Sequence, residues 1–364
     1  FIDLLNYENL KNKNIELKKT KRVYLEDAQY YIEDVRKNII ERLSYEKVYK
    51  QGFNINTPIN LELQKIATNS LRKGLIAYDR RKGWRGSLKN IQYTENWLDK
   101  IEKNLRLEKS IGWKIAIVKK VNQFNAEIET EKNQEGLIEY KDISWTKKEF
   151  TELLKVGDVI YVKKKSDGKF TLEQIPKING GIVVMNPYTG RVLAISGGFS
   201  FRNSEFNRAS QALRQPGSAF KPFVYLAALD DGYSPTTRIL DAPLVVDQGP
   251  NKPKWKPANY TKRFYGPSIM RVGIEKSRNL MTARLAMAIG MPVVQDYAKK
   301  FNINADLPPY LSMALGAGET TLIKITAAYG QLVNGGLKVS PSLIDRVQDR
   351  YGKTIMRHDN RRCK

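Results

Sequence analysis

The stretch that most constrains the fold is Gln-Pro-Gly-Ser-Ala-Phe-Lys-Pro at residues 215–222, which is followed by an apolar run over residues 223–229. A proline next to a glycine is typical of a turn, and proline is tolerated in the first turn of a helix. The sequence therefore predicts a turn that leads directly into a buried helix. Because Ser218 and Lys221 are three residues apart, this helix would place them on one face, about one turn apart.

A serine at the start of a buried helix is well placed for chemistry, because the first N–H groups of a helix are unpaired and carry partial positive charge. Its hydroxyl becomes a nucleophile when a base takes the proton. The only histidine is His358, in a polar segment near the end of the chain, so we do not expect a Ser-His-Asp triad. A lysine can serve as the base when burial or a nearby cation lowers its pKa. We predict Ser218 as nucleophile and Lys221 as general base, although the pair alone is also compatible with chance.

A second element, Ser-Arg-Asn at residues 277–279, strengthens the interpretation of Ser218 and Lys221 as a catalytic pair. Ser-x-x-Lys combined with Ser-Asp-Asn and Lys-Thr-Gly is a signature of penicillin-binding proteins and β-lactamases. Ser277 would carry a proton between Lys221 and a leaving amine, and Asn279 would hold the lysine and the substrate amide. The same triplet is equally suited to cap a helix that begins here. The two roles are compatible.

With these motifs the chain resembles the class A penicillin-binding proteins, most closely their 1A type. The resemblance extends over residues 180–345 and rests on segments that occur in the family's order, at residues 181–194, 208–209, 214–218, 257–260 and 314–316. It implies a serine acyltransferase that cross-links peptidoglycan. Ser218 would attack the penultimate D-alanine of a stem peptide, Ser277 would protonate the leaving D-alanine, and an amine of a neighbouring strand would resolve the acyl-enzyme. Penicillin would acylate the same serine, and transpeptidation would need no cofactor or metal.

The resemblance also implies a multidomain α+β fold with four parts. We expect the helical end of a glycosyltransferase domain at residues 1–50, an interdomain linker at 51–110, an OB-like β-barrel at 111–175 and a transpeptidase domain at 176–364. Hydrophobic residues at helical spacing in the first part and short strands in the third agree with this division. The last part would be a β-lactamase-like α/β sandwich, in which an antiparallel sheet covers the nucleophile helix.

The family's Lys-Thr-Gly element has no match after Asn279. The only later Lys-Thr pair is Lys353-Thr354, followed by isoleucine, and we reject it because it lies in a turn. We therefore expect a fragment that stops before this motif and begins after the catalytic residues of the glycosyltransferase. Residues 1–364 alone would then bind penicillin poorly and aggregate, since half of the oxyanion hole would be missing.

The balance of 62 Lys and Arg against 38 Asp and Glu gives a net charge of +24, which favours an anionic partner. The alternative function is therefore a basic nucleic-acid-binding protein without catalysis, which would use Phe124, Tyr140 and Trp145 on the barrel. The basic run at residues 78–86 would bind phosphates or a sugar, or else pack on a neighbouring domain. We favour the enzyme. The single cysteine, Cys363, excludes a disulfide framework within the chain.

The expected partners follow from the resemblance. They are peptidoglycan stem peptides and glycan strands, β-lactam antibiotics and, through the barrel, other proteins of cell-wall synthesis. The complete protein would also polymerise glycan strands. It would be held on the periplasmic side of the inner membrane by an N-terminal anchor absent from this chain, in which no apolar run approaches the length of a membrane span.

Overall fold

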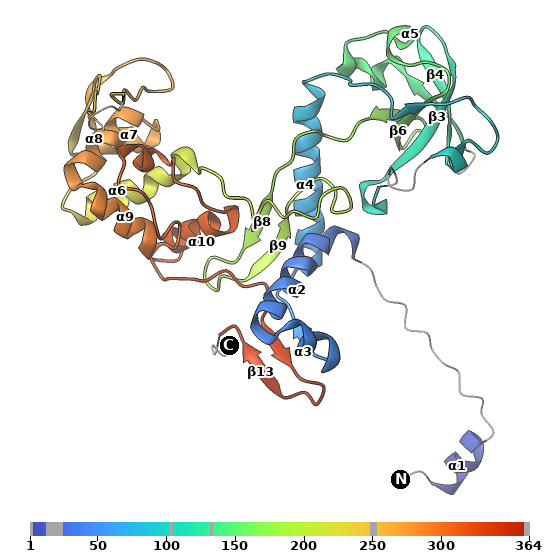
Figure 1. The fold of residues 1–364 in the computed structure, drawn as a ribbon, viewed down its shortest axis with the longest axis horizontal. Helices are drawn as coiled ribbons and strands as arrows, with labels where there is room; N and C mark the ends of the chain where they lie inside the picture. The colour runs from blue at the N-terminus through green and yellow to red at the C-terminus, as the bar shows by residue number, and fades with distance from the viewer. Residues whose placement is uncertain are drawn as a thin grey trace.

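The computed structural model describes residues 3–11, 25–101, 105, 107–131, 134–247 and 253–359, so Cys363 lies outside the described residues. A barrel, a helical cluster and a smaller group of hairpins and helices surround the long helix α4, Leu61–Arg80 (Figure 1). This arrangement confirms the predicted multidomain α+β fold. None of the described helices combines the length and apolar composition needed to cross a membrane.

The N-terminal part is helical, as its periodicity indicates. It contains α1 (Leu4–Lys11), α2 (Gln29–Leu43) and α3 (Tyr45–Lys50). Helix α2 buries Tyr31 and Ile39 in a cluster shared with the β8–β9 hairpin. The Tyr31 hydroxyl donates to the backbone oxygens of Val192 and Leu343, at 2.9 and 3.1 Å, and so links the first helices to segments far along the chain.

Helix α4 extends beyond its predicted end near Leu75. It continues through Arg80 because the buried Asp79 accepts hydrogen bonds from Arg85 and Gln174, and these partners are not evident from local sequence. The short strand β1 (Asn54–Asn56) precedes the helix and pairs with β12 (Arg346–Gln348), which pairs in turn with β13 (Thr354–Arg357). A strand that precedes α4 therefore meets two strands near the C-terminal end of the described residues in one sheet.

The predicted five-stranded OB-like barrel is confirmed. Its strands are β3 (Trp113–Val121), β4 (Asn125–Thr130), β5 (Glu135–Glu139), β6 (Asp158–Lys164) and β7 (Phe170–Glu173). They follow the order β6-β3-β4-β5-β7, and a β6–β7 pairing closes the barrel. A further short strand, β2 (Lys89–Asn90), pairs with β6, so the sheet starts earlier than residue 111. The short helix α5 (Phe150–Leu153) buries Phe150 in the barrel core.

The strands β8 (Ile182–Met185) and β9 (Val192–Ser196) form an antiparallel hairpin. Helix α4 closes the outer edge of β9. The Asn60 N–H donates to the Leu193 oxygen, and the Gln64 amide bonds to both the N–H and the oxygen of Ile195 at 3.0 Å. Gln64 therefore takes the place of a neighbouring strand, and the α4 backbone covers the edge.

The remaining elements form the helical cluster that contains Ser218. They are the 3₁₀ turn η7 (Gly217–Phe220), α6 (Lys221–Asp230), β10 (Arg238–Asp241), β11 (Gly266–Ile269), α7 (Met270–Glu275), α8 (Asn279–Ile289), α9 (Met291–Lys300), the 3₁₀ turn η8 (Leu311–Leu315) and α10 (Leu322–Val333). Strands β10 and β11 pair with each other.

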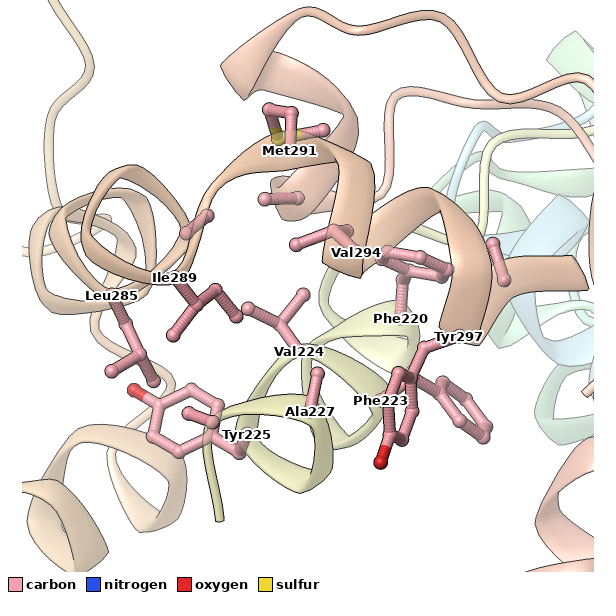
Figure 2. Packing of buried hydrophobic residues seen from close by; sticks show 14 of the residues in the cluster. Phe220, Phe223, Val224, Tyr225, Ala227, Leu285, Ile289, Met291, Val294 and Tyr297 are labelled. Atoms are coloured by element: carbon pink, nitrogen blue, oxygen red, sulfur yellow. The ribbon is translucent and has the colours of Figure 1, made fainter. Parts of the chain in front are cut away.

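Helix α6 is buried, as its apolar run predicts, but its expected position against a sheet is wrong. Phe223 and Val224 of α6 pack with Leu285 of α8 and Val294 of α9 in a core made mostly by helices (Figure 2). The β8–β9 hairpin contacts α4, α2 and α10 instead. Because those three helices already pack on the hairpin, the apolar side chains of α6 are buried by α8 and α9.

Candidate active site

The predicted nucleophile and base lie at the junction of η7 and α6. In a 3₁₀ turn, side chains three residues apart are eclipsed, so Ser218 and Lys221 are aligned more closely than on an α-helix. Ser218 is exposed, and among the described residues its hydroxyl has no hydrogen-bond partner. Lys221 begins α6 and is only 2% exposed. The junction therefore presents a free hydroxyl to solvent and keeps the amine beneath the surface.

The η7 turn is held by a segment about a hundred residues further along the chain. The Gly217 N–H donates to the Gly316 oxygen at 3.0 Å, and Arg214 and Thr320 exchange two backbone hydrogen bonds. Gly316 has φ +83°, and a Cβ atom there would lie 2.0 Å from the Gly217 oxygen. Only glycine fits this contact. Residues 314–316 belong to the segments that carry the resemblance, but the sequence predicts no role for them.

The Lys221 amine contacts the first and the last residue of the second motif. Its Nζ donates to the Ser277 oxygen at 2.7 Å, to Ser277 Oγ at 3.0 Å and to Asn279 Oδ1 at 2.6 Å. Burial lowers the pKa of Lys221 from 10.5 to about 8, because a charged amine loses solvation inside the protein. A substantial fraction of this lysine is therefore neutral at mildly alkaline pH.

Ser277 adopts a backbone conformation that favours glycine. It has φ +53° and follows the end of α7. Its N–H donates to the Ile274 oxygen and the Arg278 N–H donates to the Gly273 oxygen, which is the Schellman pattern of helix termination. Glycine is the usual residue at this position. A serine there is strained, and the strained backbone presents both its oxygen and its exposed hydroxyl to Lys221.

Asn279 begins α8, and its amide is held at both ends. Oδ1 accepts from Lys221, and Nδ2 donates to the Ala258 oxygen at 2.8 Å. The interpretation of the Ser-Arg-Asn triplet as a helix cap is wrong, since no side chain of the triplet caps α8. The cap is Asn259, whose Oδ1 accepts from the N–H groups of Asn279 and Leu280, at 2.9 and 3.3 Å. A cap from a distant segment has no local sequence signal.

The structure thus brings Lys221, Ser277 and Asn279 into direct contact and places Ser218 one turn from the lysine. Lys353, which we do not expect to form the Lys-Thr-Gly element, lies directly before β13, a strand of the sheet that β1 and β12 also form. Within the described residues, no group of His, Cys, Asp or Glu side chains is arranged to hold a metal ion.

The basic and aromatic residues of the barrel region mostly pair with each other. Arg80 forms an ion pair with Glu173 and lies over the Trp145 ring, while Trp145 packs edge-to-face on Trp84. Of the three aromatic residues proposed for nucleic-acid binding, Phe124 and Tyr140 are exposed and Trp145 is half-buried. Arg80 and Trp84 of the basic run at residues 78–86 thus pack on the barrel, as one of its two interpretations predicts, whereas Arg81 and Lys82 are exposed.

Comparison with known proteins agrees with this geometry. The family model of the penicillin binding protein transpeptidase domain matches residues 180–362, and that of the penicillin-binding protein OB-like domain matches residues 84–178. The fold and the site therefore define a penicillin-binding protein, and the chain belongs to the penicillin-binding protein transpeptidase family.

Among its relatives, the chain is 43% identical over 353 residues to penicillin-binding protein 1A of Rickettsia prowazekii, covering 96% of this chain and 45% of the relative. It is 34% identical over 346 residues to the Pseudomonas aeruginosa protein of the same name, covering 90% of this chain and 41% of the relative. The crystal structure of penicillin-binding protein 1A from Haemophilus influenzae superposes with a TM-score of 0.81 at 28% identity, over 98% of this chain and 53% of that one. The chain thus spans less than half the length of these two curated relatives.

Proposed function

We propose that the protein containing this chain cross-links peptidoglycan by serine D,D-transpeptidation and is acylated by penicillin at Ser218. One observation carries the proposal: a buried lysine whose pKa burial lowers to about 8 lies one turn from an exposed serine and bonds to Ser277 and Asn279. Family membership and the names of the relatives support the same reaction.

The proposed steps begin with neutral Lys221, which takes the proton of the Ser218 hydroxyl as its oxygen attacks the substrate carbonyl. A bond then forms between Ser218 Oγ and the carbonyl carbon, and the bond from that carbon to the terminal D-alanine nitrogen breaks. Ser277 Oγ, 3.0 Å from Lys221 Nζ, passes the proton on to the departing amine. In a β-lactam the broken bond is the ring C–N bond, so the leaving amine stays attached.

Asn279 would hold the substrate while it fixes the lysine. An amide NH₂ group has two hydrogens, and Asn279 uses one for the Ala258 oxygen. The second would donate to the amide oxygen of the stem peptide. An amine of a second stem peptide would then attack the acyl-enzyme and release Ser218, so the proposed steps use no cofactor.

The wider setting belongs to the same proposal. The substrates would be stem peptides on glycan strands, and the site of action the periplasmic side of the inner membrane. The barrel would contact other proteins of cell-wall synthesis. The names of the relatives support the β-lactam and peptidoglycan part of this proposal, and the paired basic residues around the barrel do not favour a nucleic-acid function.

The test is covalent labelling of the protein that contains this chain with a fluorescent penicillin. Ser218→Ala should remove the label completely, because no other described hydroxyl begins a Ser-x-x-Lys turn at a buried lysine. Ser144→Ala is the matched control, since Ser144 is also exposed and begins a 3₁₀ turn, in the barrel. Persistent labelling of Ser218→Ala, or loss of labelling in the control alone, would refute the assignment.

A further inference from the structure

The orientation of the Asn279 amide decides what Lys221 contacts. With Oδ1 toward Lys221, the amide accepts from the amine at 2.6 Å, and its NH₂ group donates to the Ala258 oxygen at 2.8 Å. If the amide were turned over, two N–H donors would face the lysine and an oxygen would face the Ala258 carbonyl. Both contacts would be repulsive. The segment that carries Ala258 therefore selects the productive orientation.

Asn259 fixes that segment, and Asp241 fixes Asn259. The Asn259 NH₂ group donates to Asp241 Oδ1 at 2.7 Å and to the Arg263 oxygen at 3.0 Å, which leaves its Oδ1 to cap α8. Asn259 is 4% exposed and Asp241 is fully buried. Because an ionised carboxylate only accepts hydrogen bonds, it holds the Asn259 amide with the NH₂ end toward itself.

The buried carboxylate forms an ion pair. Asp241 Oδ2 lies 3.8 Å from Arg278 Nε, and the Arg278 guanidinium stacks over the Tyr265 ring at 3.3 Å. Arg278 is the middle residue of the second motif, so Asp241 is linked to this motif by an ion pair as well as through Asn259. Arg278 thus offsets part of the charge of Asp241, whose Oδ2 accepts no hydrogen bond from the described residues, while Oδ1 orients the amide.

We propose that Asp241 and Asn259 are positioning residues that set the Asn279 amide, and through it the Lys221 amine. The expected effect on the acylation rate rests on the proposed function. Asp241 lies outside the segments that carry the resemblance, and Asn259 lies in one of them, at residues 257–260, for which the sequence predicts no role. Their contacts form a single path, from Asp241 to Asn259, to Asn279 and then to Lys221, in which each member determines which atom the next one presents.

An exchange of the two side chains tests the path. Asp241→Asn replaces the acceptor-only carboxylate by an amide, whose oxygen or NH₂ group can face position 259, so the Asn259 orientation is no longer fixed. Asn259→Asp brings two carboxylates face to face. The double variant Asp241→Asn/Asn259→Asp restores one carboxylate and one amide with their places exchanged. The carboxylate at position 259 can cap α8, where the helix N-terminus favours negative charge, and the amide at position 241 can donate to it.

The measurement is the second-order rate constant of acylation by a fluorescent penicillin. Each single variant should lose about tenfold or more, as expected for a hydrogen-bonded network broken at one member. The double variant should recover part of this loss, because an amide again meets a carboxylate, while the Arg263 oxygen stays without its donor. Asp230→Asn is the matched control, because Asp230 accepts a hydrogen bond from Tyr297 at the far end of α6. It should acylate at the parent rate.

A second readout does not depend on acylation. The ¹³Cε and ¹⁵Nζ chemical shifts of Lys221, assigned with Lys221→Arg, should move in each single variant and return in the double variant. If one of the single variants does not fold, Asn259→Ser is measured instead. It breaks the link to Asp241 without placing two carboxylates together.

Three results would overturn the inference. The single variants could acylate at the parent rate, or the double variant could lose as much rate as the two single losses multiplied together. The Lys221 chemical shifts could also stay unchanged in the single variants. A parent protein that is not acylated would refute the proposed function instead. The inference would then be judged by the Lys221 shifts alone.

Discussion

At the scale of single residues, the site contains two residues that lower the stability of the fold, one by its burial and one by its backbone conformation. Lys221 is an amine with almost no exposure to water, and Ser277 has the left-handed backbone that favours glycine. Strained or poorly solvated residues are found where a function requires them. Here the strained serine presents two oxygens to the amine, so the two unfavourable residues lie in direct contact.

The lowered pKa of Lys221 predicts how stability depends on pH. Its pKa is about 8 in the folded state against an ordinary value of 10.5. Between these values the unfolded chain binds more protons, so the free energy of unfolding rises with pH, by roughly 3 kcal/mol in all. Below pH 8 this stabilisation is absent. Lys221→Met should therefore be more stable than the parent at pH 7 and lack this rise.

Urea unfolding from pH 7 to pH 10 measures the effect. The parent contains many other titrating groups, so the relevant quantity is the difference between the parent and Lys221→Met at each pH. Lys324→Met, at an exposed position on α10, is the control and should follow the parent. Parallel stability curves for the parent and Lys221→Met would show that burial does not destabilise the charged amine.

At the scale of elements, the position of Ser218 depends on the contact between η7 and the segment after η8. Gly316→Ala should displace the η7 turn, because its Cβ would meet the Gly217 oxygen. Gly335→Ala is a close control: Gly335 has a similar φ of +82°, but nothing lies within 4 Å of its Cβ position. Both variants bear left-handed strain of about 1–2 kcal/mol, and only Gly316→Ala adds a steric clash.

We therefore expect Gly335→Ala to lower stability but acylate normally, whereas Gly316→Ala should lose most of its acylation rate. Labelling kinetics on samples matched for folded fraction separate the two effects. Equal acylation of the two variants would show that the contact with Gly316 does not position the nucleophile.

Single elements also show what the sequence could predict. Helix α6 was predicted because its turn, proline and apolar run are local signals, and Ser218 and Lys221 were found with it. Ser277 and Asn279 required the resemblance. The role of Asn259 and the length of α4 beyond Leu75 depend on partners distant in sequence. The position of α6 among helices depends on which helices pack on the β8–β9 hairpin. That packing is a property of the whole fold.

At the scale of the whole molecule, α4 joins the barrel to the part that leads to the site. Near its C-terminus Arg80 pairs with Glu173 of the barrel, and near its N-terminus Gln64 bonds to β9 and to the Asp27 oxygen. These contacts fix both ends of a 20-residue helix. The barrel and the β8–β9 hairpin are therefore held by one rigid element.

Gln64→Leu should weaken this junction strongly. It leaves the N–H and the oxygen of Ile195 without partners at a buried edge, at a cost of roughly 2–4 kcal/mol. Lys73→Ala, at an exposed position on the same helix, should be nearly neutral. Chemical denaturation compares the two variants, and an unchanged midpoint for Gln64→Leu would show that the hairpin edge does not depend on this side chain.

The contact between Gly217 and Gly316 has a consequence for the order in which the protein folds. It closes a loop of about a hundred residues, and the bonds from Lys221 to Ser277 and Asn279 close loops of 56 and 58 residues. Long loops form late, because their entropy is lost before their contacts are gained. The contacts of α6 with α8 and α9 in the helical core span similar distances along the chain, so the core and the site form together, after the local helices and hairpins. The ability to react with penicillin is thus acquired as one of the last events of folding, and labelling can serve as a clock for its completion.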